Sequence, residues 1–376
     1  MESQEIISSL VSRARIAQAQ VANYTQEQID RVCTAIAWEV YNDENIRQLA
    51  ELAVSETGMG SLEDKITKHK NKVLGVIDDA RRYRSVGLIE EDAARGIKKY
   101  AKPVGVVGAL TPITNPTATP SSNAVSIVKG RNAVIFAPHP SAKRSTGLAV
   151  SFLRAGLKKA GAPEDLIQVI EEPSIELTGE LMRQVDLIVA TGGGPMVKAA
   201  YSSGKPAFGV GPGNSCQIIA EDADLPDAAK KIRTSKAFDN ATSCSSENSI
   251  VIQERVYESM LAALIAAGGF LVTGEARARL RDTMWKLNKK GALVINGEIV
   301  ARSAKKIASL AGIDVPEQTV MLLVEGEMPL EEDLFAEEKL SPVLTLWRYG
   351  AFAEGVEILR RLTDNSGRGH SCGIHT

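Results

Sequence analysis

Cys244 is the residue of this sequence with the clearest capacity for covalent chemistry. It lies within residues 238–248, a stretch of small polar side chains in which a serine stands on each side of the cysteine. The stretch has no apolar stripe that would bury the thiol, so we expect Cys244 to be accessible. A thiolate is nucleophilic, and amides, dipoles or a base promote its formation. The pattern indicates a nucleophilic cysteine, with an idle or buried cysteine as the alternative.

A glycine-rich turn is the second candidate site. The apolar run at residues 187–190 leads into Thr191 and three successive glycines, and Pro195 then occupies a first helical position. Glycines let a backbone approach a ligand closely, and the N–H groups at a helix start bind anions. We expect a phosphate or pyrophosphate group to bind there. An ordinary strand-to-helix turn is the alternative.

The remaining motifs are weaker evidence for a functional site. Residues 209–215 resemble part of a dinucleotide-binding fingerprint but lack its final glycine. The four histidines form neither an H-E-x-x-H motif nor a set with paired cysteines, so no metal site is expected. We interpret the lysine-rich residues 65–72 as a solvated helix face rather than an anion site, because charge runs usually face water.

Helices are expected throughout the first hundred residues. Thr25 and Gln28 have the spacing of a capping box, and apolar residues recur at helical spacing from Ile29 to Val40. Cys33 belongs to that apolar face, so we expect it to be a small core residue.

From residue 103 onward, strand and helix patterns alternate. Short β-branched runs are separated by amphipathic stretches such as residues 141–160, whose end carries two lysines followed by a glycine, as helix C-termini do. This alternation predicts right-handed βαβ units and a mostly parallel sheet. The expected strands are residues 104–109, 133–136, 167–170 and 187–190 in a first set and residues 249–252, 293–295, 320–324 and 343–347 in a second, with the domain crossing near residues 229–237.

Composition excludes several classes of protein. The 376 residues contain 44 Lys and Arg against 46 Asp and Glu, so no bulk positive charge favours nucleic acid or an anionic membrane. Apolar runs are too short to span a bilayer, and no secretory signal is visible. The four cysteines are too widely spaced to suggest a disulfide framework. We therefore expect a cytoplasmic globular protein.

The sequence resembles the aldehyde dehydrogenase superfamily, and within it the CoA-acylating branch that includes the aldehyde dehydrogenase half of bifunctional aldehyde-alcohol dehydrogenases. Matching blocks occur in the family's order along almost the whole chain. They are residues 111–117, 137–143, 190–206, the segment around Cys244, and residues 338–343.

The resemblance implies a catalytic role for two residues. Cys244 matches the nucleophile that attacks the aldehyde, and Asn115 matches the asparagine whose amide stabilises the resulting oxyanion together with the backbone N–H of Cys244. Hydride then passes to NAD or NADP, and coenzyme A takes the acyl group from Cys244. The implied reaction converts a small aldehyde, such as acetaldehyde, sulfoacetaldehyde or succinic semialdehyde, into its acyl-CoA.

The resemblance also implies cofactor contacts. Glu338 matches the carboxylate that holds the nicotinamide ribose, and the glycine-rich turn matches the pyrophosphate site. His370 matches a histidine common in the acylating branch, with a role near nicotinamide or CoA, or in the structure alone. Lys143 or Arg144 is a candidate for meeting a 2′-phosphate, or faces solvent. The cofactor-binding residues implied are Thr111, Pro112, Pro138, His139, Thr191, Gly192, Gly193, Gly194, Glu338 and His370.

One departure from the family favours CoA over water as the acyl acceptor. Hydrolytic relatives carry a Glu-Leu-Gly-Gly block whose glutamate activates water, whereas Val210 stands at that position here. Loss of a general base removes roughly 10²–10⁴-fold of hydrolysis, so the thioester survives until a thiol arrives. The alternatives are a hydrolytic aldehyde dehydrogenase, a catalytically inactive nucleotide-binding or shell-assembly homologue, and a relative of the glutamyl-phosphate reductases.

The fold implied is α/β, aldehyde dehydrogenase-like, with two Rossmann-like parallel-sheet domains and the active cleft between them. We expect residues 1–233 to hold an N-terminal helical segment and the dinucleotide-binding domain, and residues 234–376 to hold the catalytic domain. The family continues beyond this end of the chain, so we expect a truncated C-terminus, and a homo-oligomer when the full C-terminus is present.

Overall fold

The computed structural model describes residues 2–367 and 370–376, which are divided into two compact units. The first unit contains the chain up to Gly58 and Leu62–Gly211, and the second contains Met59–Ser61 and the chain from Pro212 onward. The boundary expected at Arg233 lies inside helix α9 (Leu225–Ala237), which packs with helix α10 of the second unit. The second unit therefore begins before the expected boundary.

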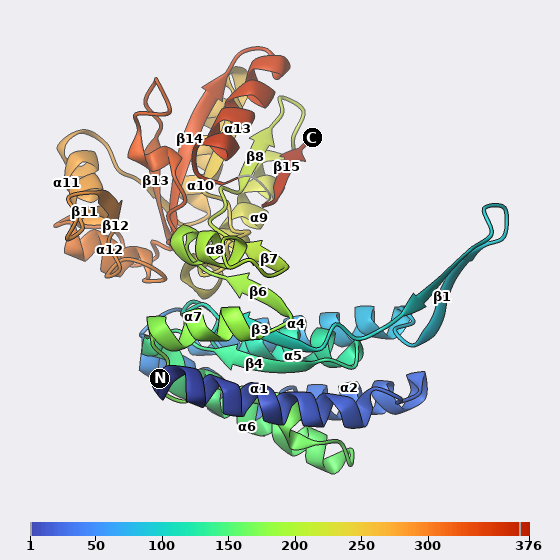
Figure 1. Cartoon of the computed structure of the whole chain (residues 1–376). Coiled ribbons are helices and arrows are strands. Elements are labelled where there is room, and N and C mark those ends of the chain that lie inside the picture. Colours follow the sequence, from blue (N-terminus) through green and yellow to red (C-terminus); the bar gives the residue numbers. More distant parts are fainter. Residues whose placement is uncertain (1, 368–369) are drawn as a thin grey trace. The chain divides into compact units, whose positions relative to one another are not determined.

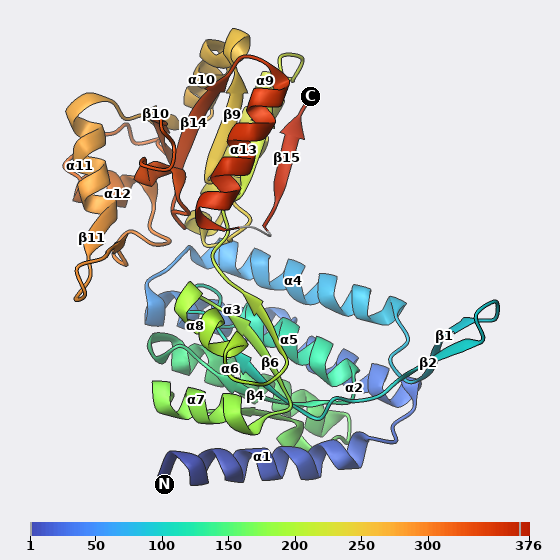
Figure 2. The same ribbon diagram turned by 45° about the horizontal axis from the view of Figure 1, so that its top comes forward.

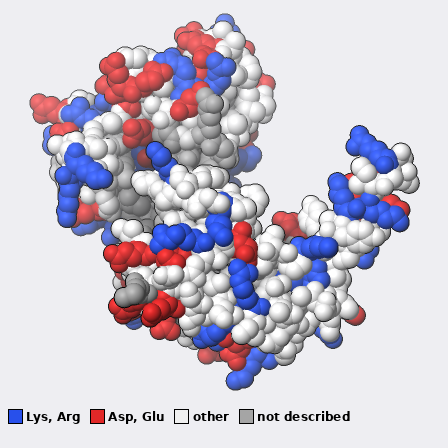
Figure 3. Space-filling model, viewed as in Figure 1, with Lys and Arg blue, Asp and Glu red and all other residues white. Residues whose placement is uncertain are grey.

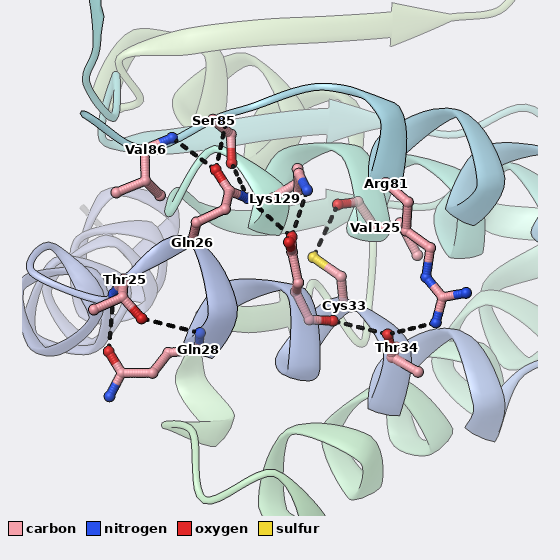
Figure 4. A network of polar contacts seen from close by, with 11 residues as sticks. Thr25, Gln26, Gln28, Cys33, Thr34, Arg81, Ser85, Val86, Val125 and Lys129 are labelled. Carbon is pink, nitrogen blue, oxygen red and sulfur yellow. Dashed lines mark hydrogen bonds and ion pairs between the residues drawn. The ribbon is translucent and has the colours of Figure 1, made fainter. Parts of the chain in front are cut away.

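Four helices open the first unit: α1 (Glu2–Val21), α2 (Gln26–Glu39), α3 (Asp43–Thr57) and α4 (Leu62–Arg82). The capping box at the start of α2 is confirmed, since Thr25 accepts from the Gln28 N–H while the Gln28 side chain accepts from the Thr25 N–H. Cys33 is buried, and its sulfur points toward the carbonyl of Val125 at 3.7 Å (Figure 4). The expectation of a core cysteine is confirmed.

A β-hairpin interrupts the helical region. Strands β1 (Gly87–Asp92) and β2 (Ile97–Ala101) pair antiparallel and extend away from the rest of the first unit (Figure 1). The expectation that the first hundred residues are all helical is wrong here. The two strands are mostly exposed and carry charged side chains, so they lack the apolar alternation from which a strand is predicted.

A five-stranded parallel sheet forms the core of the first unit, in the order β5-β4-β3-β6-β7. Strands β3, β4 and β6 of this sheet are labelled in Figure 2. Strands β3 and β4 are buried along their whole length, as expected of a sheet covered on both faces, whereas β6 alternates between buried and partly buried residues. The elements are β3 (Val106–Leu110), α5 (Ala118–Lys129), β4 (Ala133–Ala137), α6 (Lys143–Lys159), β5 (Ile167–Val169), α7 (Ile175–Gln184), β6 (Leu187–Thr191), α8 (Gly194–Tyr201) and β7 (Ala207–Val210).

A six-stranded parallel sheet forms the core of the second unit, in the order β10-β13-β14-β9-β8-β15. The strands are β8 (Cys216–Ile219), β9 (Ser249–Gln253), β10 (Gly269–Leu271), β13 (Met321–Glu325), β14 (Val343–Tyr349) and β15 (Cys372–His375), with α9, α10 (Tyr257–Ala266) and α13 (Phe352–Ser366) against them. The α/β fold with parallel sheets is confirmed.

A smaller group of elements lies between β10 and β13 in the chain. It consists of α11 (Gly274–Met284), β11 (Trp285–Leu287), β12 (Leu293–Ile295) and α12 (Ala304–Leu310). Strand β12 pairs antiparallel with β11 and does not join the main sheet, contrary to its expected place in the second strand set. Short 3₁₀ helices complete the fold: η1 (Pro140–Ala142), η2 (Glu164–Leu166), η3 (Phe238–Ala241), η4 (Glu254–Val256) and η5 (Leu334–Ala336).

The surface carries charged side chains of both signs. Acidic and basic side chains are interspersed over the face drawn in Figure 3. Among the residues that the structure describes, no helix combines the length and the apolar character needed to cross a membrane.

Candidate active site

Cys244 lies in an exposed loop between η3 and β9, so the expectation of an accessible thiol is confirmed. The neighbouring chain is held firmly, because Ser246 to Gln253 are all buried. The Ser246 N–H donates to the carbonyl of Ser243 at 2.9 Å, which closes a tight turn around the cysteine. The thiol therefore faces solvent, while the chain that follows it is buried and hydrogen-bonded.

Three consecutive non-glycine residues before the loop are left-handed. Asp239, Asn240 and Ala241 have φ values of 50°, 51° and 58°. Each such residue costs roughly 1–3 kcal/mol and persists only where the surroundings fix it. The run turns the chain sharply between α9 and Cys244.

Polar contacts hold this strained turn in place. The Asp239 carboxylate is fully buried and accepts from the Ser61 N–H at 2.9 Å and from the Thr242 hydroxyl at 2.5 Å. The Asn240 amide donates to the carbonyl of Ala301 at 3.2 Å. Sequence reasoning missed Asp239, since its partner Ser61 lies far upstream and no local pattern announces the contact.

The other cysteines differ from Cys244 in their surroundings. Burial raises the pKa of the Cys33 thiol and of the Cys216 thiol to about 12, so both stay protonated near neutral pH. Cys372 is exposed but belongs to strand β15, where it pairs in register with Cys216 of β8. Cys244 is thus the exposed cysteine that lies in a loop.

The glycine-rich turn has the expected geometry. Strand β6 ends at Thr191, Gly193 is the N-cap of α8, and Pro195 stands in the first turn. The Gly192 N–H donates to the carbonyl of Val210, while the N–H groups of Gly193 and Gly194 have no acceptor among the described residues. A side chain at Gly192 would press on the Met196 sulfur at 3.0 Å. The turn offers two N–H groups to an anion.

Asn115 is oriented by a buried lysine. The Lys68 ammonium donates to the Asn115 Oδ1 at 3.2 Å, and the Asn115 Nδ2 lies 3.4 Å from the Thr114 hydroxyl. Because the ammonium is a donor only, it fixes which end of the amide is oxygen. The Asn115 NH₂ is thereby left as the donor end, which is the end an oxyanion needs.

The expectation that residues 65–72 form a solvated face is wrong for three of them. Lys65, Lys68 and His69 are buried, because α4 packs against α5. Burial lowers the pKa of His69 to about 4, although a hydrogen bond to the Val40 backbone opposes this shift. The ring of His69 is therefore neutral near pH 7.

Pro138 and His139 follow strand β4. The His139 Nδ1 accepts from the Ser141 N–H at 3.1 Å, and burial lowers the pKa of His139. Pro138 is buried and His139 is half-buried. His139 is therefore a local cap for η1, and its ring stays neutral near pH 7.

The start of helix α6 is occupied by the protein's own carboxylate. Glu56 accepts from the N–H groups of Arg144 and Ser145 at 2.9 and 2.8 Å. Lys143 pairs with Glu172 at 2.5 Å. A 2′-phosphate at the start of α6 would therefore compete with Glu56 for these N–H groups and with Glu172 for Lys143, and Glu56 is a further residue that sequence reasoning missed.

Glu338 lies beside two buried lysines. Burial raises the pKa of Glu338 to about 7, opposed by a hydrogen bond from the Gly213 backbone and by the cations Lys236 and Lys339. Burial also lowers the pKa of Lys236 and of Lys339 to about 7. The Lys339 ammonium donates to the carbonyls of Phe335 and Glu337 at 2.7 and 2.9 Å. The charge of Glu338 is therefore sensitive to pH near neutrality.

His370 packs against Gly213. A Cβ built on Gly213 would overlap the His370 ring, so only glycine fits there. The His370 Nε2 is buried and has no hydrogen-bond partner among the described residues. Gly213 thus touches both Glu338 and His370, and it is a residue whose role sequence reasoning missed.

The predicted residues fall into one group in each unit. In the first unit, Thr111, Pro138 and Thr191 stand at the carboxyl ends of β3, β4 and β6, with Pro112, His139 and the glycines directly after them. These strands are neighbours, and the chain order reverses between β3 and β6, which is where open parallel sheets bind ligands. The second unit contributes Cys244, Glu338 and His370.

Comparisons with known proteins agree with these features. The aldehyde dehydrogenase family profile matches residues 1–376. A sulfoacetaldehyde dehydrogenase of Acholeplasma sp is 63% identical over 371 residues, which cover 99% of this chain and 76% of the relative. A sulfoacetaldehyde dehydrogenase (acylating) of Bilophila wadsworthia is 57% identical, covering 98% of this chain and 80% of the relative.

A solved structure shows the same likeness. The crystal structure of an acetylating aldehyde dehydrogenase from Geobacillus thermoglucosidasius superimposes with a TM-score of 0.94 at 36% identity, covering 100% of this chain and 82% of the other. The sequence blocks, the parallel sheets and these matches agree. The chain belongs to the aldehyde dehydrogenase family.

Proposed function

We propose that this chain oxidises sulfoacetaldehyde, using coenzyme A as acyl acceptor and NAD or NADP as hydride acceptor, to give sulfoacetyl-CoA. It is an acylating aldehyde dehydrogenase, as its relatives are. The observation that carries the assignment to this site is the exposed Cys244 on its strained, hydrogen-bonded loop. An exposed thiol whose supporting chain is fixed is what a nucleophile requires.

The chain's own residues divide the chemistry between them. The Cys244 thiolate attacks the aldehyde carbon, and the carbonyl oxygen becomes an oxyanion. The NH₂ of Asn115, oriented by Lys68, and the backbone N–H of Cys244 donate to that oxyanion. After loss of hydride, the acyl group stays on Cys244 as a thioester. The thiol of coenzyme A then attacks the thioester and releases Cys244.

The residues present fit a dinucleotide. NAD(P)⁺ supplies the hydride acceptor when it is bound. The Gly193 and Gly194 N–H groups suit its pyrophosphate, and the Glu338 carboxylate suits hydroxyls of the nicotinamide ribose. We propose that Thr111, Pro112, Pro138 and His139 form the remainder of the cofactor surface at the carboxyl edge of the first sheet, and that His370 lies near nicotinamide or CoA.

The choice of CoA over water depends on Val210. This residue ends strand β7, and its carbonyl accepts from Gly192. A valine side chain has no base with which to activate water, so the thioester on Cys244 is spared from hydrolysis. Because position 210 has no general base, the acyl group is transferred to CoA rather than to water.

We assign the substrate from sequence similarity to named relatives. The two relatives described above act on sulfoacetaldehyde by name, and they match this chain over nearly its whole length. Acetaldehyde and succinic semialdehyde, which the sequence also suggested, are the competitors to be tested. Homo-oligomeric assembly and a cytoplasmic location stay predictions.

Steady-state assays test the proposal directly. Purified protein is incubated with NAD⁺ or NADP⁺ and each aldehyde, with and without CoA, while cofactor reduction and acyl-CoA formation are followed. Fast reduction with sulfoacetaldehyde, dependent on CoA and absent in Cys244→Ala, is expected. Full-rate reduction without CoA, with free acid as product, would identify a hydrolytic enzyme. Binding without turnover would identify an inactive homologue, and NADPH oxidation only with acyl phosphate would identify a reductase.

A further inference from the structure

A cavity adjoins the Cys244 loop within the second unit. It has a volume of about 500 Å³ and is bounded by helix α9, by Phe238 and by the loop itself. The two residues that flank the cysteine, Ser243 and Ser245, both line it. A molecule in this cavity therefore lies next to the segment that carries the thiol.

The cavity carries more positive than negative charge. Lys230, Lys231 and Asp227 of α9 line it. Lys231 pairs with Asp227 at 2.6 Å, whereas Lys230 has no carboxylate partner among the described residues. One lysine charge is thus left uncompensated at the wall. An uncompensated charge at a cavity attracts ligands of the opposite sign.

Hydroxyl donors complete the lining. The Oγ atoms of Ser243 and Ser245 make no hydrogen bond to another described residue, whereas Thr234 donates to the carbonyl of Lys230 at 2.8 Å. Serine hydroxyls rotate to suit an acceptor, and an ionised acceptor makes the stronger hydrogen bonds. The half-buried ring of Phe238 adds an apolar surface suited to a methylene group.

We propose that this cavity binds the anionic end of the aldehyde substrate and so determines selectivity for short aldehydes that carry a sulfonate or carboxylate. Lys230 supplies the attracting charge, Ser243 and Ser245 donate to the anion, and Phe238 packs against the intervening carbon. Binding there brings the aldehyde carbon toward Cys244. This inference rests on the proposed function and adds the residues that recognise the substrate.

The test compares substrates and variants. Specificity constants are measured for sulfoacetaldehyde, succinic semialdehyde and neutral propionaldehyde at saturating CoA and cofactor. In Lys230→Met we expect the preference for sulfoacetaldehyde over propionaldehyde to fall roughly tenfold, mainly through KM, and Lys230→Arg should restore it. Asp227→Asn should raise the preference, because it removes the opposing charge. Lys290→Met, an exposed lysine in the same unit but outside the cavity, is the matched control.

The outcomes separate the two proposals. A preference that drops in Lys230→Met and in Ser245→Ala but not in Lys290→Met supports the cavity, and the arm with succinic semialdehyde shows whether sulfonate or carboxylate fits it better. A wild-type enzyme that favours sulfoacetaldehyde while Lys230→Met and Ser245→Ala keep that preference overturns the cavity alone. A wild-type enzyme that does not use sulfoacetaldehyde overturns the proposed substrate.

Discussion

The imidazole of His370 rests directly on the Cα of Gly213, so closely that no side chain can be placed there. The N–H of the same glycine donates to Glu338. One residue without a side chain therefore connects two residues proposed to serve the cofactors. A larger residue at position 213 would displace the His370 ring.

Gly213→Ala should displace the His370 ring directly, and a shift of the backbone at residue 213 should weaken the hydrogen bond to Glu338. Overpacking of this kind costs roughly 1–3 kcal/mol of stability, and we expect a higher KM for NAD(P)⁺ together with a lower kcat. Thermal unfolding and steady-state kinetics measure the two effects. Gly211→Ala is the matched control, since the nearest atom to its Cβ is 3.9 Å away. Equal behaviour of the two variants would contradict the tight packing.

Lys68→Met should impair the oxyanion donor without removing it. The variant loses the contact that orients Asn115, so we expect kcat to fall by about tenfold, while Asn115→Ala loses about 10²–10³-fold. Lys72→Met, on an exposed position of the same helix, should keep normal kcat. A normal kcat in Lys68→Met, with the fold intact, would show that Asn115 needs no such support.

Cofactor binding should depend on pH through Glu338. Because the pKa of Glu338 is about 7, the carboxylate gains a proton as the pH falls through neutrality, and a neutral carboxyl accepts ribose hydrogen bonds less well. We expect KM for NAD(P)⁺ to rise below pH 7 in the wild type and to stay flat in Glu338→Gln. Since the Lys236 cation lowers the pKa of Glu338, Lys236→Met should move the midpoint to higher pH.

Stability should respond to the same group in a defined direction. The pKa of Glu338 is higher in the folded protein than its ordinary value of 4.5, so the folded state holds an extra proton between pH 4.5 and about 7. The contribution of protonated Glu338 to the free energy of unfolding is therefore complete below this pH range. It is lost as the pH rises through the range. Denaturant unfolding of wild type and Glu338→Gln across this range measures the difference, and parallel pH profiles would contradict it.

Alkylation should separate the cysteines by burial. Because the pKa of both Cys33 and Cys216 is about 12, iodoacetamide near neutral pH should modify Cys244 and Cys372 in the native protein and spare the other two. Peptide mapping identifies the modified sites. Activity should be lost in step with Cys244 and persist in Cys372→Ala. Inactivation that followed Cys372 instead would refute the assigned nucleophile.

Val210→Glu should redirect the thioester toward water. The new carboxylate supplies the base that hydrolytic relatives possess, so we expect free acid to appear at the expense of acyl-CoA when CoA is limiting. Val210→Gln, of the same shape but without a base, should not produce this change. Both substitutions are compatible with the fold because Val210 is 48% exposed at the end of β7. Chromatographic analysis of the products gives the ratio.

The parallel sheets were predictable because several of their strands, such as β3, β4 and β9, are buried along their whole length. Residues such as Val134 and Val251 therefore lie in short, continuous apolar runs that can be read in the sequence. The β1–β2 hairpin was not, since its charged residues Glu90 and Lys99 pair with each other in the open and leave no apolar pattern. Burial of Lys68 also escaped prediction, because it depends on helix α5, which lies far along the chain.

The candidate site also has features that local sequence predicts and features that depend on contacts remote in sequence. Local patterns were enough for the exposure of Cys244 and for the glycines before α8, because loops and helix starts have their own chemistry. The residues that support the site were invisible, since Asp239 and Gly213 act through partners remote in sequence. Contacts between residues so far apart in the sequence become visible only in the structure.

The left-handed turn before Cys244 has a consequence for biosynthesis. Its buried aspartate is satisfied by Ser61, which the ribosome delivers long before the cysteine itself. A nascent or partly unfolded chain that has not brought these two stretches together has no reason to keep the strained backbone. The loop that carries Cys244 therefore takes its native shape only after Ser61 and Asp239 have come together.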